Sequence, residues 1–350
     1  MTASTLYFAF PGDLDTPTGG YHYDRRLIGE LRAMGLDVHT LPLSDRFPFP
    51  DASARNQARQ TLRALPDGAV VIVDGLAFGA LDELAAAETQ RLRLIALCHH
   101  PLALEAGLDA AQQQAFLASE RRALLHTRAV VVTSEHTRQI LAAEYGVPAD
   151  RIAVACPGTD RTPFSPCDGD PVRLLTVASL TQRKGHDLLI DALAPLTALP
   201  WQARFVGGMD FNPAWAEELR QRVNRLHLQS RIHLVGAVDD LQAEYRTADV
   251  FVLPSRFEGY GMVFAEALAA GLPVIATRAG AVPDVVPDTA GLLVAPEDTQ
   301  ALSEALRSLL TRPDLRRQLQ AGARGAAASL PTWSDSARRI ARLIEEVQQQ

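Results

Sequence analysis

Short apolar runs alternate with longer amphipathic stretches along the first half of the chain. The apolar runs predict strands at residues 5–10, 38–41, 69–74, 92–97, 129–133 and 152–155. Between them, apolar positions at helical spacing predict helices at residues 23–34, 81–89, 110–126 and 134–145. Strands that alternate with helices are typical of βαβ units, in which helices cover a parallel sheet.

The alternation is interrupted once and then begins again. Residues 156–171 are rich in Pro, Gly and Asp and predict a linker. Beyond it the same patterns predict strands at 172–178, 203–206, 232–235, 250–254, 273–277 and 291–294, and helices at 185–197, 213–226, 241–247, 262–270, 299–311, 313–327 and 334–347. The predicted fold class is α/β, with two Rossmann-like, doubly wound parallel sheets. We place one in residues 1–165 and one in residues 166–333, and expect the helix within 334–350 to cross back to the first domain.

Composition and charge narrow the class of protein. Hydrophobic residues make up 47% and charged residues 21% of the chain, which is ordinary for a globular protein with a full core. The net charge of −7 gives no electrostatic support for a nucleic-acid partner. Arginine pairs at 25–26 and 121–122 are interpreted first as solvated helix faces. An anionic acceptor or a lipid headgroup surface is the alternative.

Cysteine content and the lengths of the apolar runs bear on the compartment. Cys98, Cys156 and Cys167 form no CxxC pair and cannot build a disulfide framework, which favours a reducing compartment. The first residues lack the basic region of a signal peptide. The apolar runs are far shorter than the roughly 18 residues of a membrane helix. We expect a cytoplasmic protein without a transmembrane segment, for which contact with a membrane surface stays open.

The strongest chemical signal is VLPSRFEGYGMVFAEALAAGLPVIAT, residues 252–277. A strand is predicted to end near Ser255, and a helix to begin near Met262. Backbone N–H groups of residues 259–262 would lie at the positive end of that helix, which suits a diphosphate. The glycines would let the backbone approach such a ligand closely. Glu258 stands on the loop, and Glu266 follows about one turn inside the helix.

A second signal is VASLTQRKGHDLLI, residues 177–190, which predicts a strand, a loop and a helix. Its loop carries Arg183 and Lys184, the only lysine in the chain. Fixed cations in such a loop can stabilise the charge that develops on a leaving diphosphate without a metal ion. The alternative is a solvent-exposed pair of basic residues before a helix.

The block at 252–277 resembles the family 4 retaining glycosyltransferases of the GT-B fold, whose E-x7-E motif matches Glu258 and Glu266. The resemblance implies that Glu258 contacts the donor sugar near the reacting carbon and that Glu266 binds the ribose hydroxyls. It also implies that Lys184 grips the donor phosphates. The family arginine is absent, because the matching position is Ser179 or Ala178 here, and Arg183 is the candidate substitute.

Weaker matches lie elsewhere along the chain. Gly19 and Gly20 resemble a mobile glycine-rich loop near the donor phosphate and the acceptor. The resemblance further implies that a histidine after the strand LRLIALC contacts the donor sugar near its C6 hydroxyl, and alignment favours His99 over His100. The predicted catalytic residues are Glu258, Lys184, Arg183 and His99. The predicted donor-binding residues are Gly19, Gly20, His100, Gly207, Val235, Gly236, Gly259, Tyr260, Gly261, Met262, Val263 and Glu266.

The function implied by the resemblance is retaining transfer of a hexosyl unit from a UDP-, GDP- or ADP-sugar to a hydroxyl. The acceptor is a lipid, a glycan or a small molecule. In a GT-B enzyme the two sheets face a central cleft, and the departing phosphate can take the acceptor proton. No cofactor and no metal are implied. Two D-x-D patterns, at residues 13–15 and 168–170, are explained by turn formation.

Other functions stay open at this point. A nucleotide-sugar epimerase shares the fold, and a degenerate sugar-nucleotide sensor would keep the binding residues without catalysis. A pyridoxal-type phosphorylase needs a Schiff-base lysine, and Lys184 cannot hold a phosphate and form a Schiff base as well. A glycosidase needs two carboxylates about 5–9.5 Å apart. Glu266 is expected to point to the ribose instead.

Overall fold

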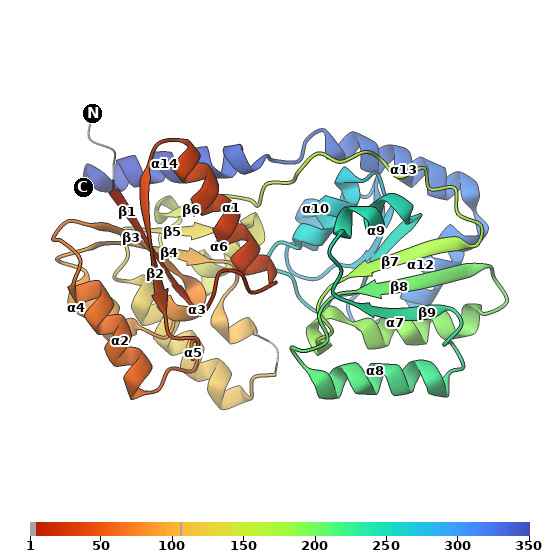
Figure 1. Ribbon diagram of the computed structural model, residues 1–350, viewed down its shortest axis with the longest axis horizontal. Coiled ribbons are helices and arrows are strands. Elements are labelled where there is room, and N and C mark those ends of the chain that lie inside the picture. Colours follow the sequence, from red (N-terminus) through yellow and green to blue (C-terminus); the bar gives the residue numbers. More distant parts are fainter. Residues whose placement is uncertain (1–4, 106) are drawn as a thin grey trace. The chain divides into compact units, whose positions relative to one another are not determined.

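The computed structural model describes residues 5–105 and 107–350 and divides into two compact units (Figure 1). Unit 1 contains the described residues up to Gly158 together with Pro331–Gln350, and unit 2 is Thr159–Leu330. Each unit is an open parallel sheet covered by helices on both faces.

In the part of the chain that the structure describes, unit 1 has a six-stranded parallel sheet in the order β2-β1-β3-β4-β5-β6. Its strands are β1 (Thr5–Pro11), β2 (Asp37–Leu43), β3 (Val70–Asp74), β4 (Arg93–Cys98), β5 (Ala129–Val132) and β6 (Ile152–Val154). Its helices are α1 (Gly19–Ala33), α2 (Ala52–Arg63), α3 (Gly75–Phe78), α4 (Asp82–Glu88), α5 (Ala110–Leu124), α6 (Glu135–Glu144) and α14 (Trp333–Gln348). In Figure 1, α2, α4 and α5 lie below this sheet, and α1 and α14 lie above it. All residues of β3 are buried, as expected for a strand covered on both faces.

Unit 2 repeats this architecture over its own described residues, with a six-stranded parallel sheet in the order β12-β11-β10-β7-β8-β9. Its strands are β7 (Val172–Val177), β8 (Trp201–Val206), β9 (Ile232–Gly236), β10 (Val250–Leu253), β11 (Val274–Thr277) and β12 (Gly291–Val294). Its helices are α7 (His186–Leu193), α8 (Pro213–Arg225), α9 (Leu241–Thr247), α10 (Met262–Ala269), α11 (Val282–Val285), α12 (Thr299–Thr311) and α13 (Pro313–Ala327). Side chains of α7, α8 and α12 share one hydrophobic core with residues of the sheet.

The order of strands places a topological switch point in each unit. In unit 1 the chain runs from β1 outward to β2 and then returns to the other side of β1 with β3. In unit 2 it runs from β7 outward to β9 and returns to the other side of β7 with β10. Open α/β sheets bind ligands outside the carboxyl ends of their strands at such points. These two places are therefore where a functional site is expected.

The boundary between the units lies at 158/159 and 330/331, whereas the sequence analysis placed it at 165/166 and 333/334. Residues just after 158 are held by unit 2. The Ser165 N–H donates to the Ala270 carbonyl at 2.8 Å, and the Ser165 hydroxyl donates to the Ala248 carbonyl at 2.6 Å. Gly158 packs directly on the start of α14, where an added Cβ would lie 2.1 Å from the Trp333 nitrogen.

Several elements differ from the sequence-based expectation: the short helices α3 and α11 were not predicted, and three further differences have a local physical reason. Helix α2 was not predicted, because two of its three buried positions are alanines, which give a weak amphipathic signal. Helix α1 begins at Gly19 rather than at residue 23, since the Thr18 side chain caps it by accepting the Tyr21 N–H at 3.4 Å. The two glycines are thus its first turn and not a loop. The helix expected over 185–197 ends as a 3₁₀ turn that contains Pro195, which has no N–H to continue the α-helical bonding.

Candidate active site

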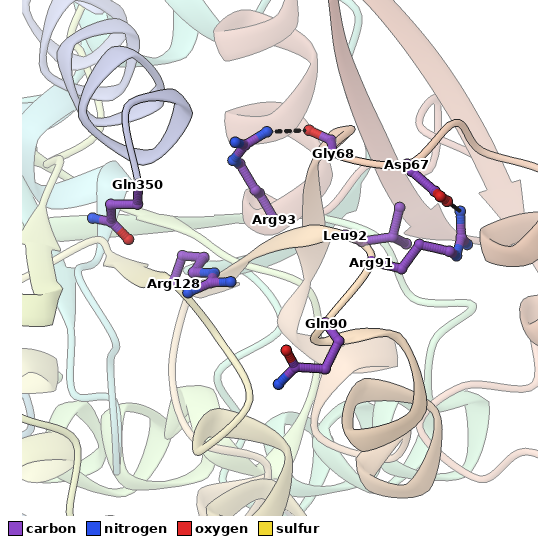
Figure 2. A pocket seen from close by; sticks show the side chains of 8 residues that line it. All are labelled: Asp67, Gly68, Gln90, Arg91, Leu92, Arg93, Arg128 and Gln350. Carbon is purple, nitrogen blue, oxygen red and sulfur yellow. Dashed lines mark hydrogen bonds and ion pairs between the residues drawn. The ribbon is translucent and has the colours of Figure 1, made fainter.

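The structure contains a cavity of about 350 Å³ at the amino ends of β3, β4 and β5 (Figure 2). Arg91, Arg93, Arg128 and Gln350 line it. Arg93 donates to the Gly68 carbonyl at 2.7 Å and so ties the loop before β3 to the sheet. This edge is opposite to the one at which parallel sheets bind ligands. We therefore look for the candidate site at the carboxyl edges of the two sheets.

At the switch point of unit 2, the loops after β7 and β10 are bonded to each other. The loop after β7 contains the 3₁₀ turn η3 (Gln182–Lys184), and Gly185 then adopts a left-handed φ of 69° before α7. Arg256, on the loop after β10, donates its N–H to the Arg183 carbonyl at 2.7 Å. Its guanidinium also pairs with Asp187 at 2.8 Å. These bonds fix the two loops relative to each other.

Glu258 lies at the centre of what we call the Glu258 cluster: Arg183, Lys184, Ser255 and Glu258. The residue is 4% exposed. Oε1 accepts from Lys184 Nζ at 2.7 Å and from Ser255 Oγ at 2.6 Å, and Oε2 lies 3.4 Å from a guanidinium nitrogen of Arg183. Burial alone would raise the pKa of Glu258, but the charges of Lys184 and Arg183 outweigh it and lower the pKa to about 2. The carboxylate is therefore ionised at neutral pH.

Helix α10 begins beside this cluster. Its N-cap is Gly261, with a left-handed φ of 86°, so no side chain caps the helix. A Cβ at this position would lie 2.5 Å from the Phe264 ring, which makes glycine necessary for both conformation and space. The first N–H groups of the helix are those of Met262 and Val263. The predicted loop residues 259–263 thus lie at a helix N-terminus that follows the Glu258 loop directly.

Glu266 lies one turn inside α10 and is partly buried. Its Oε2 accepts a hydrogen bond from the Tyr245 hydroxyl at 2.8 Å, and burial raises the pKa of Glu266. Tyr245 is fully buried and comes from α9. The sequence analysis did not identify Tyr245, because an aromatic residue in an amphipathic helix reads as an ordinary core residue.

The remaining predicted residues of unit 2 lie at the carboxyl ends of β8 and β9. The Gly207 N–H donates to the Gly236 carbonyl at 2.8 Å. A Cβ on Gly207 would lie 2.0 Å from the Ala178 carbonyl oxygen, so this glycine packs on the loop after β7. Val235 is the residue before Gly236 in β9. The structure thus brings all predicted residues of unit 2 to one edge of its sheet.

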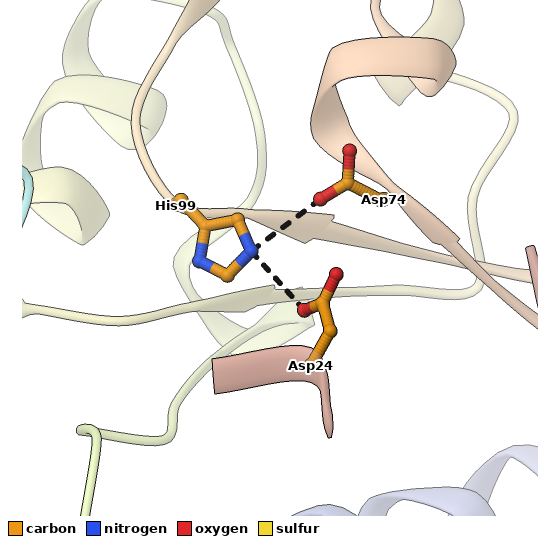
Figure 3. A group of neighbouring side chains, drawn as sticks. All are labelled: Asp24, Asp74 and His99. Atoms are coloured by element: carbon orange, nitrogen blue, oxygen red, sulfur yellow. Dashed lines mark hydrogen bonds and ion pairs between the residues drawn. The ribbon is translucent and has the colours of Figure 1, made fainter. Parts of the chain in front are cut away.

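At the switch point of unit 1, His99 forms what we call the His99 cluster with Asp24 and Asp74 (Figure 3). Its Nε2 lies 3.2 Å from Asp24 Oδ1 and 3.4 Å from Asp74 Oδ2. Both carboxylates are buried. Burial alone would lower the pKa of His99, but the hydrogen bonds and charges of the two carboxylates raise it to about 10. These separations are those of hydrogen-bonded ion pairs, and the same three ligand atoms lie close enough together to hold a metal ion.

His99 was predicted from the sequence, but neither of its two partners was. The sequence does contain a signal for Asp74, because this residue ends the apolar run VVIV of β3 in the same way that His99 follows the apolar run of β4. Asp24 had none, because it lies inside α1, where an acidic residue usually faces solvent. Gly20 lies next to the ring: a Cβ there would meet His99 Cδ2 at 3.4 Å.

His100 lies outside this cluster. Its Nε2 pairs with Glu105 Oε1 at 2.6 Å. Gly19, in the first helical turn, would meet nothing within 4 Å if it carried a Cβ. Of the predicted residues of unit 1, the structure therefore brings together His99 and Gly20 and leaves the other two apart.

The low pKa of Glu258 predicts a pH dependence of stability. Its value of about 2 lies below the ordinary 4.5, so the ionised carboxylate stabilises unit 2 above pH 4.5, and this contribution is lost as the pH falls toward 2. The difference corresponds to about 3 kcal/mol of unfolding free energy. We expect this free energy to fall more steeply with acid in the wild type than in Glu258→Gln.

Urea unfolding at several pH values measures this difference. Trp201 and Trp215 belong to unit 2, so a Trp333→Phe background confines the fluorescence signal to that unit. Parallel pH profiles for the two proteins would contradict the strong ion pairing of Glu258.

Comparison with known proteins shows which families and folds this chain resembles. Residues 17–162 match the family described as Glycosyltransferase Family 4, and residues 171–312 match the one described as Glycosyl transferases group 1. A D-inositol 3-phosphate glycosyltransferase of Xylanimonas cellulosilytica is 31% identical over 65% of this chain and 59% of its own length. The mannosyltransferase LpsB of lipopolysaccharide core biosynthesis, from Rhizobium meliloti, is 34% identical over 47% of this chain and 49% of its own.

A third relative is a GDP-mannose-dependent phosphatidylinositol monomannoside mannosyltransferase of Mycolicibacterium smegmatis, 31% identical over 61% of each chain. The matched segment thus spans only about half to three-fifths of these relatives. Among solved structures, a sucrose-phosphate synthase of Thermosynechococcus elongatus superposes with a TM-score of 0.81 at 22% identity, over 98% of this chain and 99% of the other. HepE of Anabaena in complex with UDP and glucose does so with a TM-score of 0.77 at 20% identity, over 97% and 99%. The predicted fold class and the family resemblance are confirmed. Within the described residues, none of the helices is long and apolar enough to cross a membrane.

Proposed function

The chain belongs to glycosyltransferase family 4, and we propose that it transfers a hexosyl unit from a nucleoside-diphosphate sugar to a hydroxyl acceptor with retention of configuration. The observation that carries the proposal is the Glu258 cluster. Two cationic side chains, a buried carboxylate and the start of an uncapped helix lie together at the switch point of unit 2.

The diphosphate of the donor is the group that fits the positive side of this arrangement. Lys184 and Arg183 together carry one positive charge more than Glu258 neutralises, and the N-terminal end of α10 adds the positive end of a helix dipole. In the reaction the bond from sugar C1 to the phosphate oxygen breaks, and negative charge develops on that phosphate. Cations held in place by Glu258 and by the bonded loops stabilise this charge without reorganising.

Glu258 is the group of the same site that we assign to the donor sugar. Its low pKa keeps it ionised, so it accepts hydrogen bonds from sugar hydroxyls and does not act as a proton donor. Its negative charge also favours the positive character that the sugar ring gains as the leaving group departs. The new bond joins C1 to the acceptor oxygen, and the acceptor proton goes to the departing phosphate. Glu266, held by Tyr245, is the group we assign to the ribose.

The acceptor and the compartment belong to the same proposal. The three relatives named above act, by their names, on an inositol phosphate, a lipopolysaccharide core and a phosphatidylinositol mannoside. We therefore propose a polar, hydroxyl-bearing acceptor that is a small molecule, a glycan or a lipid headgroup. Cys98, Cys156 and Cys167 are all free thiols, which supports the cytoplasm, with transient contact to a membrane surface where the acceptor is a lipid.

Donor binding tests the proposal directly. A ligand that binds only the folded state stabilises it by about 2.7 kcal/mol when its concentration is 100 times its Kd. We expect UDP-glucose, GDP-mannose or ADP-glucose, and the matching nucleoside diphosphate, to raise the melting temperature, and calorimetry to show one site. Absence of binding by every sugar nucleotide and every bare diphosphate would overturn the proposal.

Product analysis then separates the alternatives. Release of nucleoside diphosphate together with a glycoside of unchanged anomeric configuration, seen by NMR, supports retaining transfer. A changed sugar still attached to its nucleotide would indicate an epimerase. Tight donor binding without any turnover, over a panel of acceptors, would indicate a sugar-nucleotide binding protein.

A further inference from the structure

The His99 cluster contains two carboxylates that have no role in the proposed reaction. Building on the proposed function, we infer that Asp24 and Asp74 are positioning residues that keep His99 as an imidazolium and leave Nδ1–H as the group that the ring offers to a ligand. Asp24 comes from α1, Asp74 ends β3 and His99 follows β4, so three elements at one switch point build the cluster.

The geometry first fixes the proton on Nε2. This nitrogen faces Asp24 Oδ1 at 3.2 Å and Asp74 Oδ2 at 3.4 Å. Ionised carboxylates only accept hydrogen bonds. A bare nitrogen lone pair would face two negative oxygens, whereas an Nε2–H can donate to both. Figure 3 shows that the second nitrogen, Nδ1, lies on the side of the ring away from both carboxylates.

The surrounding charges then favour a proton on Nδ1 as well. Asp24 is fully buried, and within residues 5–105 and 107–350 its Oδ2 has no hydrogen-bond partner. The other oxygen of Asp74, Oδ1, accepts a hydrogen bond from the Leu76 N–H at 2.9 Å, at the start of α3. A neutral imidazole would leave two buried negative charges in contact with it, and burial of uncompensated charge is costly. The raised pKa of His99, about 10, follows from the same contacts.

The other groups around the ring do not reverse this balance. Tyr23 of α1 packs edge-on against His99, with ring centroids 5.3 Å apart, and the Thr133 hydroxyl donates to the His99 carbonyl. Burial raises the pKa of Asp24 to about 6, although the hydrogen bond and charge of His99, and more weakly Arg25, oppose this rise. Asp24 is therefore mostly ionised at pH 7, and it loses its negative charge progressively as the pH falls through about 6.

An imidazolium can donate hydrogen bonds but cannot accept a proton. His99 would therefore act by contacting an electronegative atom of the substrate, a hydroxyl or phosphate oxygen, through Nδ1–H. This agrees with a transfer in which the departing phosphate takes the acceptor proton. It also predicts that the rate will show no inflection between pH 6 and 8 from this histidine, although an ordinary histidine titrates there.

We call the holding of His99 as an imidazolium by Asp24 and Asp74 the clamp, and NMR titration of the ligand-free protein tests it. The chain has nine histidines, and a His99→Gln variant assigns the signals of residue 99. We expect the ¹⁵N shifts of His99 to report a doubly protonated ring from pH 6 to at least pH 9. Asp24→Asn and Asp74→Asn keep the shape and a hydrogen-bond acceptor while removing one charge each. Each substitution should lower the midpoint of the His99 titration by at least one pH unit.

Kinetics distinguish positioning from a merely structural role. In Asp24→Asn, kcat should match the wild type at pH 6 and fall about tenfold for each pH value above the new His99 midpoint. Loss of activity at every pH, with no displaced midpoint, would overturn the inference. Glu105→Gln is the matched control for the titration, because it removes the carboxylate beside His100 and should leave the His99 midpoint unchanged.

The wild-type titration decides the matter even where a variant fails to fold. A neutral His99 at pH 7 overturns the clamp, and so does displacement of the His99 signals by stoichiometric Zn²⁺ or Mn²⁺, which would indicate a cation site. The clamp and the proposed function can fail separately. A charged His99 in a protein that binds no sugar nucleotide would leave the clamp standing and remove the glycosyltransferase proposal.

Discussion

Replacement of Lys184 by alanine should lower kcat/KM for the sugar-nucleotide donor by a factor of about 10² or more, the usual scale for losing one preorganised charge at a developing anion. Lys184 Nζ is fixed at 2.7 Å from Glu258 Oε1, and Arg183 lies farther from the same carboxylate. The remaining guanidinium would have to neutralise both Glu258 and the diphosphate. Single-turnover release of nucleoside diphosphate measures the chemical step separately from donor binding.

The variant also leaves Glu258 buried with less compensation, so its effect on folding must be separated from its effect on catalysis. Lys184→Ala/Glu258→Gln removes both partners and should regain stability relative to Lys184→Ala while staying inactive. Lys184→Arg keeps the charge but replaces a compact ammonium with a planar fork, and we expect partial activity. Near-normal turnover in a folded Lys184→Ala protein would contradict the assignment of Lys184 to the donor diphosphate.

The unique lysine permits an independent check on the intact wild-type sequence. An amine-acylating reagent can modify only Lys184 and the N-terminal amine. Bound donor should protect Lys184 from acylation, as read by peptide mass spectrometry, while the N-terminal amine reacts as before. Equal acylation with and without saturating donor would contradict contact between Lys184 and the diphosphate.

Gly280→Ala should have the second large effect, through the backbone of the Glu258 loop. Gly280 has a left-handed φ of 58°, and a Cβ there would lie 2.1 Å from the Glu258 carbonyl oxygen. That carbonyl also accepts the Ala281 N–H at 2.9 Å. The loop must therefore shift by about 1 Å to admit a methyl group, and a displacement of that size costs on the order of 10²-fold in rate. We expect weaker donor binding and lower kcat together.

Gly146→Ala is the matched control for this substitution. Gly146 has a similar φ of 70°, but a Cβ there would meet nothing within 4 Å. It bears the left-handed strain of about 1–2 kcal/mol without any clash. Calorimetric melting and donor titration of both variants separate strain from displacement of the loop. If the two variants bind donor equally well, the close packing of Gly280 on Glu258 does not position the site.

The fold could be predicted from local pattern to a large extent. Parallel strands that are buried on both faces appear as apolar runs, and residues 69–74 and 250–254 were recognised in this way. The pattern failed where burial falls on small residues, as in α2 with Ala54 and Ala58. It also failed where a side chain sets a helix end, as Thr18 does for α1. Such choices depend on single hydrogen bonds that periodicity does not record.

The candidate site could be predicted where its residues lie close together in the sequence. Glu258, Glu266 and the glycines between them lie on one loop and one helix turn, so their spacing carries the signal. Lys184 was found because it stands before another helix. The contact between Lys184 and Glu258 joins residues on two separate strand-to-helix loops, and the order of strands β10 and β7 creates it.

By itself the sequence determined the two parallel sheets and the loop-to-helix segment that carries the residues we propose for the donor diphosphate, because those properties are local. Only the tertiary structure decided which charges compensate one another. Asp24, Asp74 and His99 are far apart in the chain, and none of their spacings has a meaning along one helix or strand. They meet because parallel strands end at a common edge. Their protonation states follow from that meeting, since the energy of a buried charge depends on its neighbours in space.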